Sequence, residues 1–309
     1  MEFLRVLEGL RTPALDTVLT ALTQLGDETV FMILAIVLFW CVSKRVAYYV
    51  FAVGLGGTVA NQWLKLIFRI PRPWVLDPSF TIVESARAAA TGYSFPSGHT
   101  QNIVGTMACL IPETRNKVLR GVCIALIILV PFSRMYLGVH TPLDVGVSFV
   151  LALALALALR PFFRDEERFR RAALPLLLAL IVFGLCYLLW VLLTRFPADV
   201  DPDNLAHGVK NGWTLLGAML GLLTAWFCDG KRLHFSEKAP LPGQIAKAVL
   251  GLALLLGIRA GLKPLLNALT GGALWANAVR YYCMVVFAGC VWPLTFPYFA
   301  KLGEKHKEN

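Results

Sequence analysis

Long apolar runs constrain this chain more than any other feature of its sequence. A helix needs roughly 20 apolar residues to cross the hydrocarbon core of a bilayer. Runs of that kind recur along the chain, too often for the core of one soluble domain. The sequence therefore predicts an all-α, polytopic bundle of transmembrane helices, with apolar segments at 28–43, 46–68, 98–113, 118–137, 142–160, 173–194, 212–228, 246–268 and 275–299.

The composition agrees with a bilayer as the surrounding medium. Of the 309 residues, 57% are hydrophobic and 16% are charged, against about 25% charged residues in soluble domains. The formal net charge is +10, but the basic residues cluster at the ends of apolar runs. No basic stripe is interleaved with aromatic residues, so we expect no nucleic acid partner.

The distribution of Lys and Arg predicts the orientation of the chain. The side that carries most of them is expected to be cytoplasmic. The N-terminus and the loops 69–97, 138–141, 195–211 and 269–274 then face outward. The cytoplasmic set is Lys44, Arg45, Arg115, Lys117, Arg120, Arg160, Arg164, Arg168, Arg170, Arg171, Lys231, Arg232, Lys238, Lys301, Lys305 and Lys307.

The N-terminal region, residues 1–27, mixes Leu with charged residues at helical spacing. Over 2–24 this pattern predicts an amphipathic helix at the membrane surface. A short helix packed on the bundle is the alternative.

A charged break at 161–172 is expected to separate two groups of helices. The seven cysteines lie in or beside apolar runs without close pairing, which favours small apolar side chains over disulfides or metal ligands.

Three short stretches place polar chemistry at the outward ends of these predicted helices. Ionisable residues at such depths are costly and usually functional. Because all three stretches lie at the same end of the predicted bundle, we expect them to converge on one pocket. The stretches run from Lys65 to Arg72 and Pro73, from Pro96 through Ser97 and Gly98 to His99, and from Ser133 and Arg134 through His140 to Asp144.

Together these stretches supply the groups that a phosphate ester requires. Lys65, Arg72 and Arg134 would make a strongly positive pocket, in which the planar guanidinium groups match phosphate oxygens. Ser97 and Gly98 stand where a helix should begin. Free backbone N–H groups at a helix N-terminus bind anions, and glycine permits close approach.

A histidine and a carboxylate at helical spacing predict a nucleophile. His140 and Asp144 share a face if a helix begins near Thr141. The carboxylate would accept one imidazole N–H and leave the other ring nitrogen free to attack. His99 would then protonate the leaving oxygen.

Each of these residues also has a structural interpretation. Lys65 and Arg72 could anchor helix ends at the membrane surface, and Ser97 could be a helix cap. Thr141 and Asp144 fit a capping box, which is compatible with orienting His140.

Charged residues elsewhere favour structural roles. Arg69 and Arg87 are expected to be solvated loop charges. The acidic loop 197–204 lacks a recognisable calcium-loop spacing, so a solvated outer loop is favoured.

The pattern K-x6-RP, PSGH and SR-x5-H-x3-D resembles the signature of the type 2 phosphatidic acid phosphatase superfamily, which includes lipid phosphatases and undecaprenyl pyrophosphate phosphatases. The resemblance implies a phosphohistidine on His140, supported by Asp144, with His99 as the acid. It implies that no metal or other cofactor is needed. It also implies that the phosphoryl oxygens are held by Lys65, Arg72, Ser97, Gly98 and Arg134.

This resemblance predicts a catalytic membrane core at 28–195 and leaves 196–309 as an accessory transmembrane region. The expected protein is an integral phosphatase of a bacterial inner membrane, with its active site facing outward. Its substrate would be a lipid phosphate or diphosphate, such as undecaprenyl pyrophosphate, phosphatidic acid or a sphingoid-base phosphate. A lipid or glycan phosphotransferase and a non-catalytic lipid-phosphate transporter or binder are the alternatives, and the sequence leaves the oligomeric state open.

Overall fold

The structure, a computed structural model, describes residues 1–302, so Lys305 and Lys307 of the basic tail lie outside the described residues. The described residues form helices and loops without any β-strand, which confirms the all-α prediction. The chain divides into two compact units. Unit 1 contains residues 1–32, 49–161 and 189–209, and unit 2 contains 33–48, 162–188 and the chain from 210 onward.

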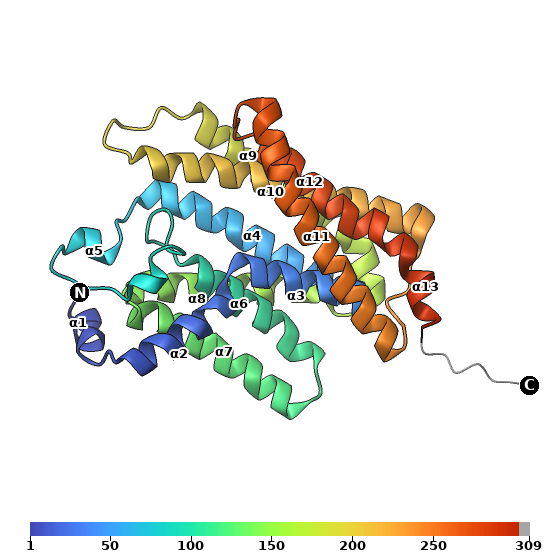
Figure 1. Cartoon of the computed structure of the whole chain (residues 1–309), viewed down its shortest axis with the longest axis horizontal. Coiled ribbons are helices and arrows are strands. Elements are labelled where there is room, and N and C mark those ends of the chain that lie inside the picture. The colour runs from blue at the N-terminus through green and yellow to red at the C-terminus, as the bar shows by residue number, and fades with distance from the viewer. Residues whose placement is uncertain (303–309) are drawn as a thin grey trace, which may run out of the picture. The chain divides into compact units, whose positions relative to one another are not determined.

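All nine predicted apolar segments are helical (Figure 1). The last of them is interrupted by π and 3-10 turns, η6 (Phe287–Val291) and η7 (Trp292–Thr295). In chain order the helices are α3 (Glu28–Cys41), α4 (Lys44–Phe68), α6 (Gly98–Leu110), α7 (Lys117–Tyr136), α8 (Pro142–Leu159), α9 (Glu166–Leu193), α10 (Pro202–Cys228), α11 (Leu241–Thr270), α12 (Ala276–Val286) and α13 (Phe296–Ala300).

Within residues 1–302, six helical stretches are long and apolar enough to cross a membrane alone, or up to seven if the bent pair Pro13–Gly26 and Glu28–Cys41 is one span. This number is lower than the nine membrane-length segments predicted. Helix α6 has 13 residues, which is about 20 Å of helix and too short for a bilayer core. Helix α4 carries Asn61, Gln62 and Lys65 in its second half, which lowers its hydropathy.

The N-terminal region forms two helices rather than the single helix predicted over 2–24. Helix α1 (Glu2–Gly9) is followed by α2 (Pro13–Thr23) and the 3-10 turn η1 (Gln24–Gly26). Thr12 caps α2 by accepting from the Leu15 amide at 3.3 Å. Pro13 lacks an N–H group, so it is favoured at a helix start and disfavoured in a continuing helix. The break is therefore set by the Thr-Pro pair.

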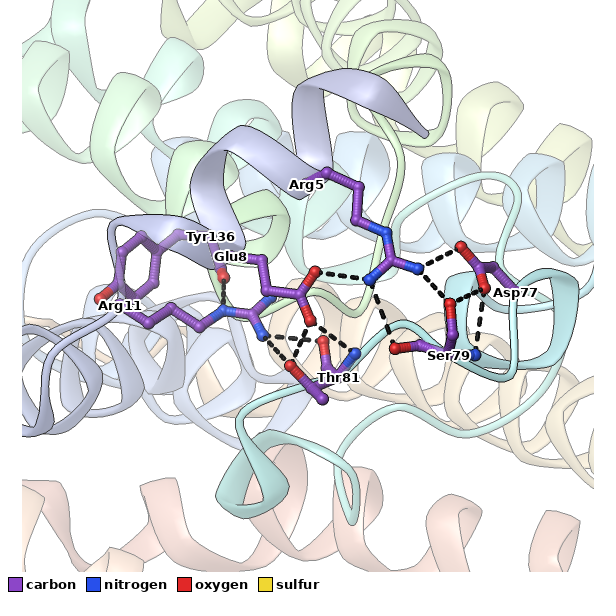
Figure 2. A network of polar contacts seen from close by, with 7 residues as sticks. All are labelled: Arg5, Glu8, Arg11, Asp77, Ser79, Thr81 and Tyr136. Atoms are coloured by element: carbon purple, nitrogen blue, oxygen red, sulfur yellow. Dashed lines mark hydrogen bonds and ion pairs between the residues drawn. The ribbon is translucent and has the colours of Figure 1, made fainter.

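Helix α1 is held against the loop that follows the short helix α5 (Pro73–Leu76), as Figure 2 shows. Arg5 Nη2 lies 2.6 Å from Asp77 Oδ2, and Glu8 Oε1 accepts from the Thr81 amide at 2.8 Å. Arg11 Nη1 donates to the Thr81 carbonyl at 2.7 Å. Leu4 and Leu7 are buried beneath this polar layer, so α1 packs on unit 1 as the alternative interpretation of this region proposed. The same helix exposes Phe3 and Val6 on another face.

The centre of unit 1 is built around α6, which packs against both α7 and α8 (Figure 1). Small residues allow this close packing. A Cβ atom at Gly105 would lie 3.9 Å from Ala152 Cβ on α8 and 3.0 Å from Val53 Cγ1 on α4. The short α6 thus begins inside the unit, surrounded by longer helices, and its N-terminus is buried with Ser97 and His99.

The charged break predicted at 161–172 is mostly helical. The 3-10 turn η4 (Arg160–Phe163) leads almost directly into α9, whose first turns carry the charges. Arg170 pairs with Glu166 at 3.1 Å, one helical turn away. Such i,i+4 pairs support a helix in water, which explains why it continues beyond its apolar part.

The contact between η1 and α6 gives a test of the packing. A Cβ atom at Gly26 would lie 2.9 Å from the His99 carbonyl oxygen and 3.0 Å from Val130 Cγ1. We expect Gly26→Ala to lower the free energy of unfolding by about 1–3 kcal/mol, as overpacking does, measured by thermal unfolding in detergent. At the matched control Gly121, on α7, a Cβ meets nothing within 4 Å. There Ala should be neutral or stabilising, because it favours a helix. Equal effects of the two substitutions would contradict this packing.

Candidate active site

His140 and Asp144 are positioned by the start of α8. Thr141 is the N-cap and forms a capping box, in which its side chain accepts from the Asp144 amide at 3.3 Å. Asp144 Oδ2 accepts from the Thr141 amide at 2.7 Å. The predicted helix start is therefore confirmed. It brings His140 Nδ1 to 3.4 Å from Asp144 Oδ2, so capping and support of the histidine coexist.

The Asp144 carboxylate has a further partner that the sequence analysis missed. Ser94 Oγ donates to Asp144 Oδ2 at 2.6 Å, and both side chains are fully buried. The Ser94 amide donates to the Ile70 carbonyl at 2.8 Å, which fixes this part of the loop. A serine two residues before Pro96 carries no spacing signal of its own, and only the fold brings it to Asp144.

Arg72 faces the other side of the imidazole. Its Nη1 lies 2.9 Å from His140 Nε2 and donates to the Val139 carbonyl, also at 2.9 Å. Nε and Nη2 donate to the carbonyls of Gly92 and Thr91 at 3.1 and 2.7 Å. Burial lowers the pKa of Arg72 to about 10, which still leaves the guanidinium charged at neutral pH. The Nε2 nitrogen of His140 therefore faces a cation.

The environment of His140 favours its neutral form. Burial first, and then the positive charges of Arg72, Arg134 and Lys65, hold its pKa well below the usual value of a histidine. A neutral imidazole that donates from Nδ1 toward Asp144 carries a lone pair on Nε2. That is the state required of a nucleophile.

Arg134 brings unused hydrogen-bond donors to the site. The side chain is fully buried in α7, and its Nη1 donates to Thr23 Oγ1 at 3.0 Å. Its Nε and Nη2 have no hydrogen-bond partner in the described part of the chain. Buried donors are almost always paired, and these two are available to donate to an anion. Thr23, from α2, is a second site residue that the sequence analysis missed.

Lys65 is buried near the C-terminal end of α4 and donates to the Tyr93 carbonyl. It comes from the same stretch as Arg72, and its partner Tyr93 directly follows Thr91 and Gly92, whose carbonyls accept from Arg72. The structure therefore places both residues of the K-x6-R pattern against one loop. Neither side chain projects outward as a membrane anchor would.

Helix α6 begins at Gly98, where the sequence predicts a helix N-terminus. Ser97 is the N-cap, and its amide donates to the Asp144 carbonyl at 3.1 Å, which joins the starts of α6 and α8. A Cβ at Gly98 would meet nothing within 4 Å, so the space beside its backbone is open. His99 follows on the first turn, and its Nε2 is buried without a partner among residues 1–302.

Two loop arginines take different positions. Arg87 is exposed and pairs with Glu84 at 2.7 Å, as expected of a solvated charge. Arg69 instead lines a cavity beside Arg72.

Of the residues predicted for the site, His140 contacts Arg72 and lies beside Asp144. Ser97 is joined to them through its backbone bond to Asp144.

A helical membrane protein with a buried His–Asp pair and three buried cations has the features of a phosphoryl-transfer site. The comparisons with known families agree. Residues 45–168 match the model of the PAP2 superfamily, and residues 213–305 match the model of its phosphatase transmembrane extension. The chain belongs to the PAP2 superfamily, which is the type 2 phosphatidic acid phosphatase superfamily that its motifs resemble.

Several relatives are lipid phosphatases. Undecaprenyl-diphosphatase BcrC of Bacillus subtilis is 29% identical over 55% of this chain and 85% of its own length. Phosphatidylglycerophosphatase B of the same organism is 26% identical over 52% and 82%. The dihydrosphingosine 1-phosphate phosphatase C823.11 of Schizosaccharomyces pombe is 22% identical over 72% and 55%. The crystal structure of Aquifex aeolicus LpxE aligns with a TM-score of 0.46 at 26% identity, over 51% of this chain and 92% of that chain.

The bond from Ser94 to Asp144 can be tested by substitution. We expect Ser94→Ala to lower the kcat for phosphate release roughly 10- to 100-fold, because a hydrogen bond to a charged group is worth about 1.5–3 kcal/mol. Ser148→Ala is the matched control. Its hydroxyl donates to the Asp144 main-chain carbonyl at 2.9 Å and leaves the carboxylate untouched. A drop confined to KM, or equal losses in both variants, would argue against a positioning role for Ser94.

Proposed function

We propose that this chain is an integral membrane phosphatase that hydrolyses a lipid phosphate or diphosphate through a phosphohistidine on His140. The observation that supports this most directly is the orientation of the imidazole. Nδ1 lies beside the Asp144 carboxylate, and Nε2 points at the Arg72 guanidinium at 2.9 Å. A phosphoryl group held by that guanidinium would meet the ring nitrogen that bears the lone pair.

In the first step His140 Nε2 attacks phosphorus, and the bond from phosphorus to the leaving oxygen breaks. His99 gives its proton to that oxygen, so the lipid leaves as a neutral alcohol or as a protonated phosphate. Asp144 stabilises the positive charge that develops on the ring of His140. Arg72 releases Nε2 and binds the phosphoryl oxygens as the substrate enters.

In the second step water attacks the phosphohistidine. His99, now neutral, accepts a proton from the water, and the bond between phosphorus and Nε2 breaks. Inorganic phosphate leaves, and both histidines return to their starting states. Water is the only co-reactant, and no step uses a metal ion.

The remaining cations would stabilise charge on the equatorial oxygens, which is the main task in phosphoryl transfer. The unpaired Nε and Nη2 of Arg134 supply two donors of the required kind. Lys65 adds a point charge, and the open space beside Gly98 admits an oxygen to the backbone. Together with Ser97 and Arg72, these are the residues we propose as phosphate ligands.

The named relatives favour a lipid substrate. They act on undecaprenyl diphosphate, phosphatidylglycerophosphate and dihydrosphingosine 1-phosphate by their names. We propose residues 28–195 as the catalytic core and 196–309 as an accessory region. A phosphotransferase would use the same phosphohistidine with another acceptor. A pure binder is disfavoured, since binding alone does not require an oriented histidine beside a carboxylate.

The histidine mechanism predicts the outcome of one substitution. We expect His140→Ala to lower phosphate release by several orders of magnitude, as loss of a covalent nucleophile does, while turnover by the unsubstituted protein survives EDTA. The assay would use detergent-purified protein with undecaprenyl diphosphate, phosphatidic acid, a sphingoid-base phosphate and glucose 6-phosphate.

His207→Ala is the matched control, because His207 lies outside the site and should leave the rate unchanged. Substantial turnover in His140→Ala, or loss of all activity in EDTA, would refute the mechanism. If an added alcohol acceptor takes the phosphoryl group in preference to water, the protein is a transferase.

We also propose that the site faces the outer side of a bacterial inner membrane, because the charged connections lie at the opposite helix ends. Ala88 and Glu166 are exposed and lie on opposite predicted sides. In intact cells, a membrane-impermeant thiol reagent should label Ala88→Cys and spare Glu166→Cys, measured against the unsubstituted protein. Labelling of the second variant alone would reverse the orientation.

A further inference from the structure

A cavity of about 560 Å³ opens in unit 1 beside the proposed site. Arg72 belongs to its wall and also contacts His140, so one guanidinium joins the cavity to the nucleophile. Trp74 and Tyr93 add aromatic surface from the loop between α4 and α6. Asp199 and Asp201, between α9 and α10, and Asn204, in the first turn of α10, complete the wall. The volume is in the range of small-molecule binding sites.

Two side chains of opposite charge line this cavity without forming an ion pair. Arg69 and Asp199 both line it, and neither side chain forms a hydrogen bond or ion pair with any residue that the structure describes. Both charged groups are therefore available to a ligand in the cavity. The lining thus offers one cation and one carboxylate without protein partners.

The backbone of Arg69 is held in an unusual conformation. Its φ is +50°, a left-handed region that few residues other than glycine adopt. Such a conformation is unfavourable for arginine and is found at functional sites where surrounding structure imposes it. Here it follows the end of α4 and leaves the guanidinium in the cavity wall, three residues before Arg72.

Tyr93 connects the acidic side of the cavity to the proposed site. Its carbonyl accepts from Lys65, and its hydroxyl accepts from the Asp201 amide at 3.3 Å. Asp201 Oδ1 in turn accepts from the Asn204 amide at 2.8 Å, at the start of α10. Asp201 is therefore engaged in that turn, and Asp199 remains as the free carboxylate.

We propose that this cavity is the subsite for the polar head of the leaving group, and that it selects lipid monophosphates with a protonated amine or a hydroxyl beside the phosphate ester. The assignment rests on the proposed function. Asp199 would bind the ammonium or hydroxyl group, Arg72 and Arg69 the phosphate side, and Trp74 the carbon skeleton. Phe68 and Val75 are exposed apolar residues at the wall, where a hydrocarbon chain can leave toward lipid.

This lining disfavours a diphosphate as the main substrate. A second phosphate in the cavity would place further negative charge near Asp199 without a compensating free cation beyond Arg69. An amino-alcohol phosphate instead matches both charges. The amine of a sphingoid-base phosphate lies one carbon from the ester carbon, so both groups enter the site together.

The test compares matched substrates in detergent: a sphingoid-base 1-phosphate, an n-alkyl phosphate of equal chain length and a polyprenyl diphosphate. In the unsubstituted protein we expect kcat/KM to favour the amino substrate over the alkyl phosphate by about tenfold or more, the size of one charge-assisted hydrogen bond. Asp199→Asn should bring this ratio close to one. Asp203→Asn, in the exposed first turn of α10 and outside the cavity, should leave the ratio unchanged.

Equal kcat/KM values for the two monophosphates in the unsubstituted protein would overturn the proposal, as would a ratio that Asp199→Asn does not change. A preference for the diphosphate that Arg69→Gln removes would assign the cavity to a second phosphate instead. Failure of the proposed function looks different. In that case no substrate releases phosphate faster than with the His140→Ala protein.

Discussion

The Asp144 carboxylate holds together the parts of this protein on which its chemistry depends. Oδ2 accepts from the backbone of Thr141 and the hydroxyl of Ser94, and it lies beside the ring of His140. The main-chain carbonyl of the same residue accepts from Ser97 at the start of α6. A single buried residue thus fixes the start of two helices, one loop and the imidazole. Since buried polar groups require partners, we expect these elements to fold cooperatively.

Around this carboxylate the protein gathers more positive charge than it neutralises. Lys65, Arg72 and Arg134 are all buried, and Asp144 is the one buried carboxylate among residues 1–302. Main-chain carbonyls compensate for part of the difference, since those of Thr91 and Tyr93 accept from Arg72 and Lys65. Buried charge without full neutralisation is unfavourable. The excess of positive charge creates an electrostatic environment that favours an anion.

Much of this arrangement follows from the sequence because periodicity and capping are local. Apolar runs predict the helices, and the spacing of His140 and Asp144 predicts their pairing once Thr141 starts a helix. Distant contacts leave no such signal. Ser94 and Thr23 reach their partners only in the fold, and the approach of Arg69 and Asp199 to one cavity joins segments 130 residues apart. The break between α1 and α2 was missed because the amphipathic pattern continues through Thr12, although the proline beside it was readable.

The bond between Thr23 and Arg134 has a consequence for the order in which the protein is made. The two residues are 111 positions apart, so α2 is synthesised long before α7. Thr23 gains this hydrogen-bond partner only after α3, α4, α6 and α7 have been synthesised. A nascent chain that ends before α7 therefore has no means of closing this end of unit 1. The helix that supplies the partner of Arg134 is therefore already made when α7 emerges.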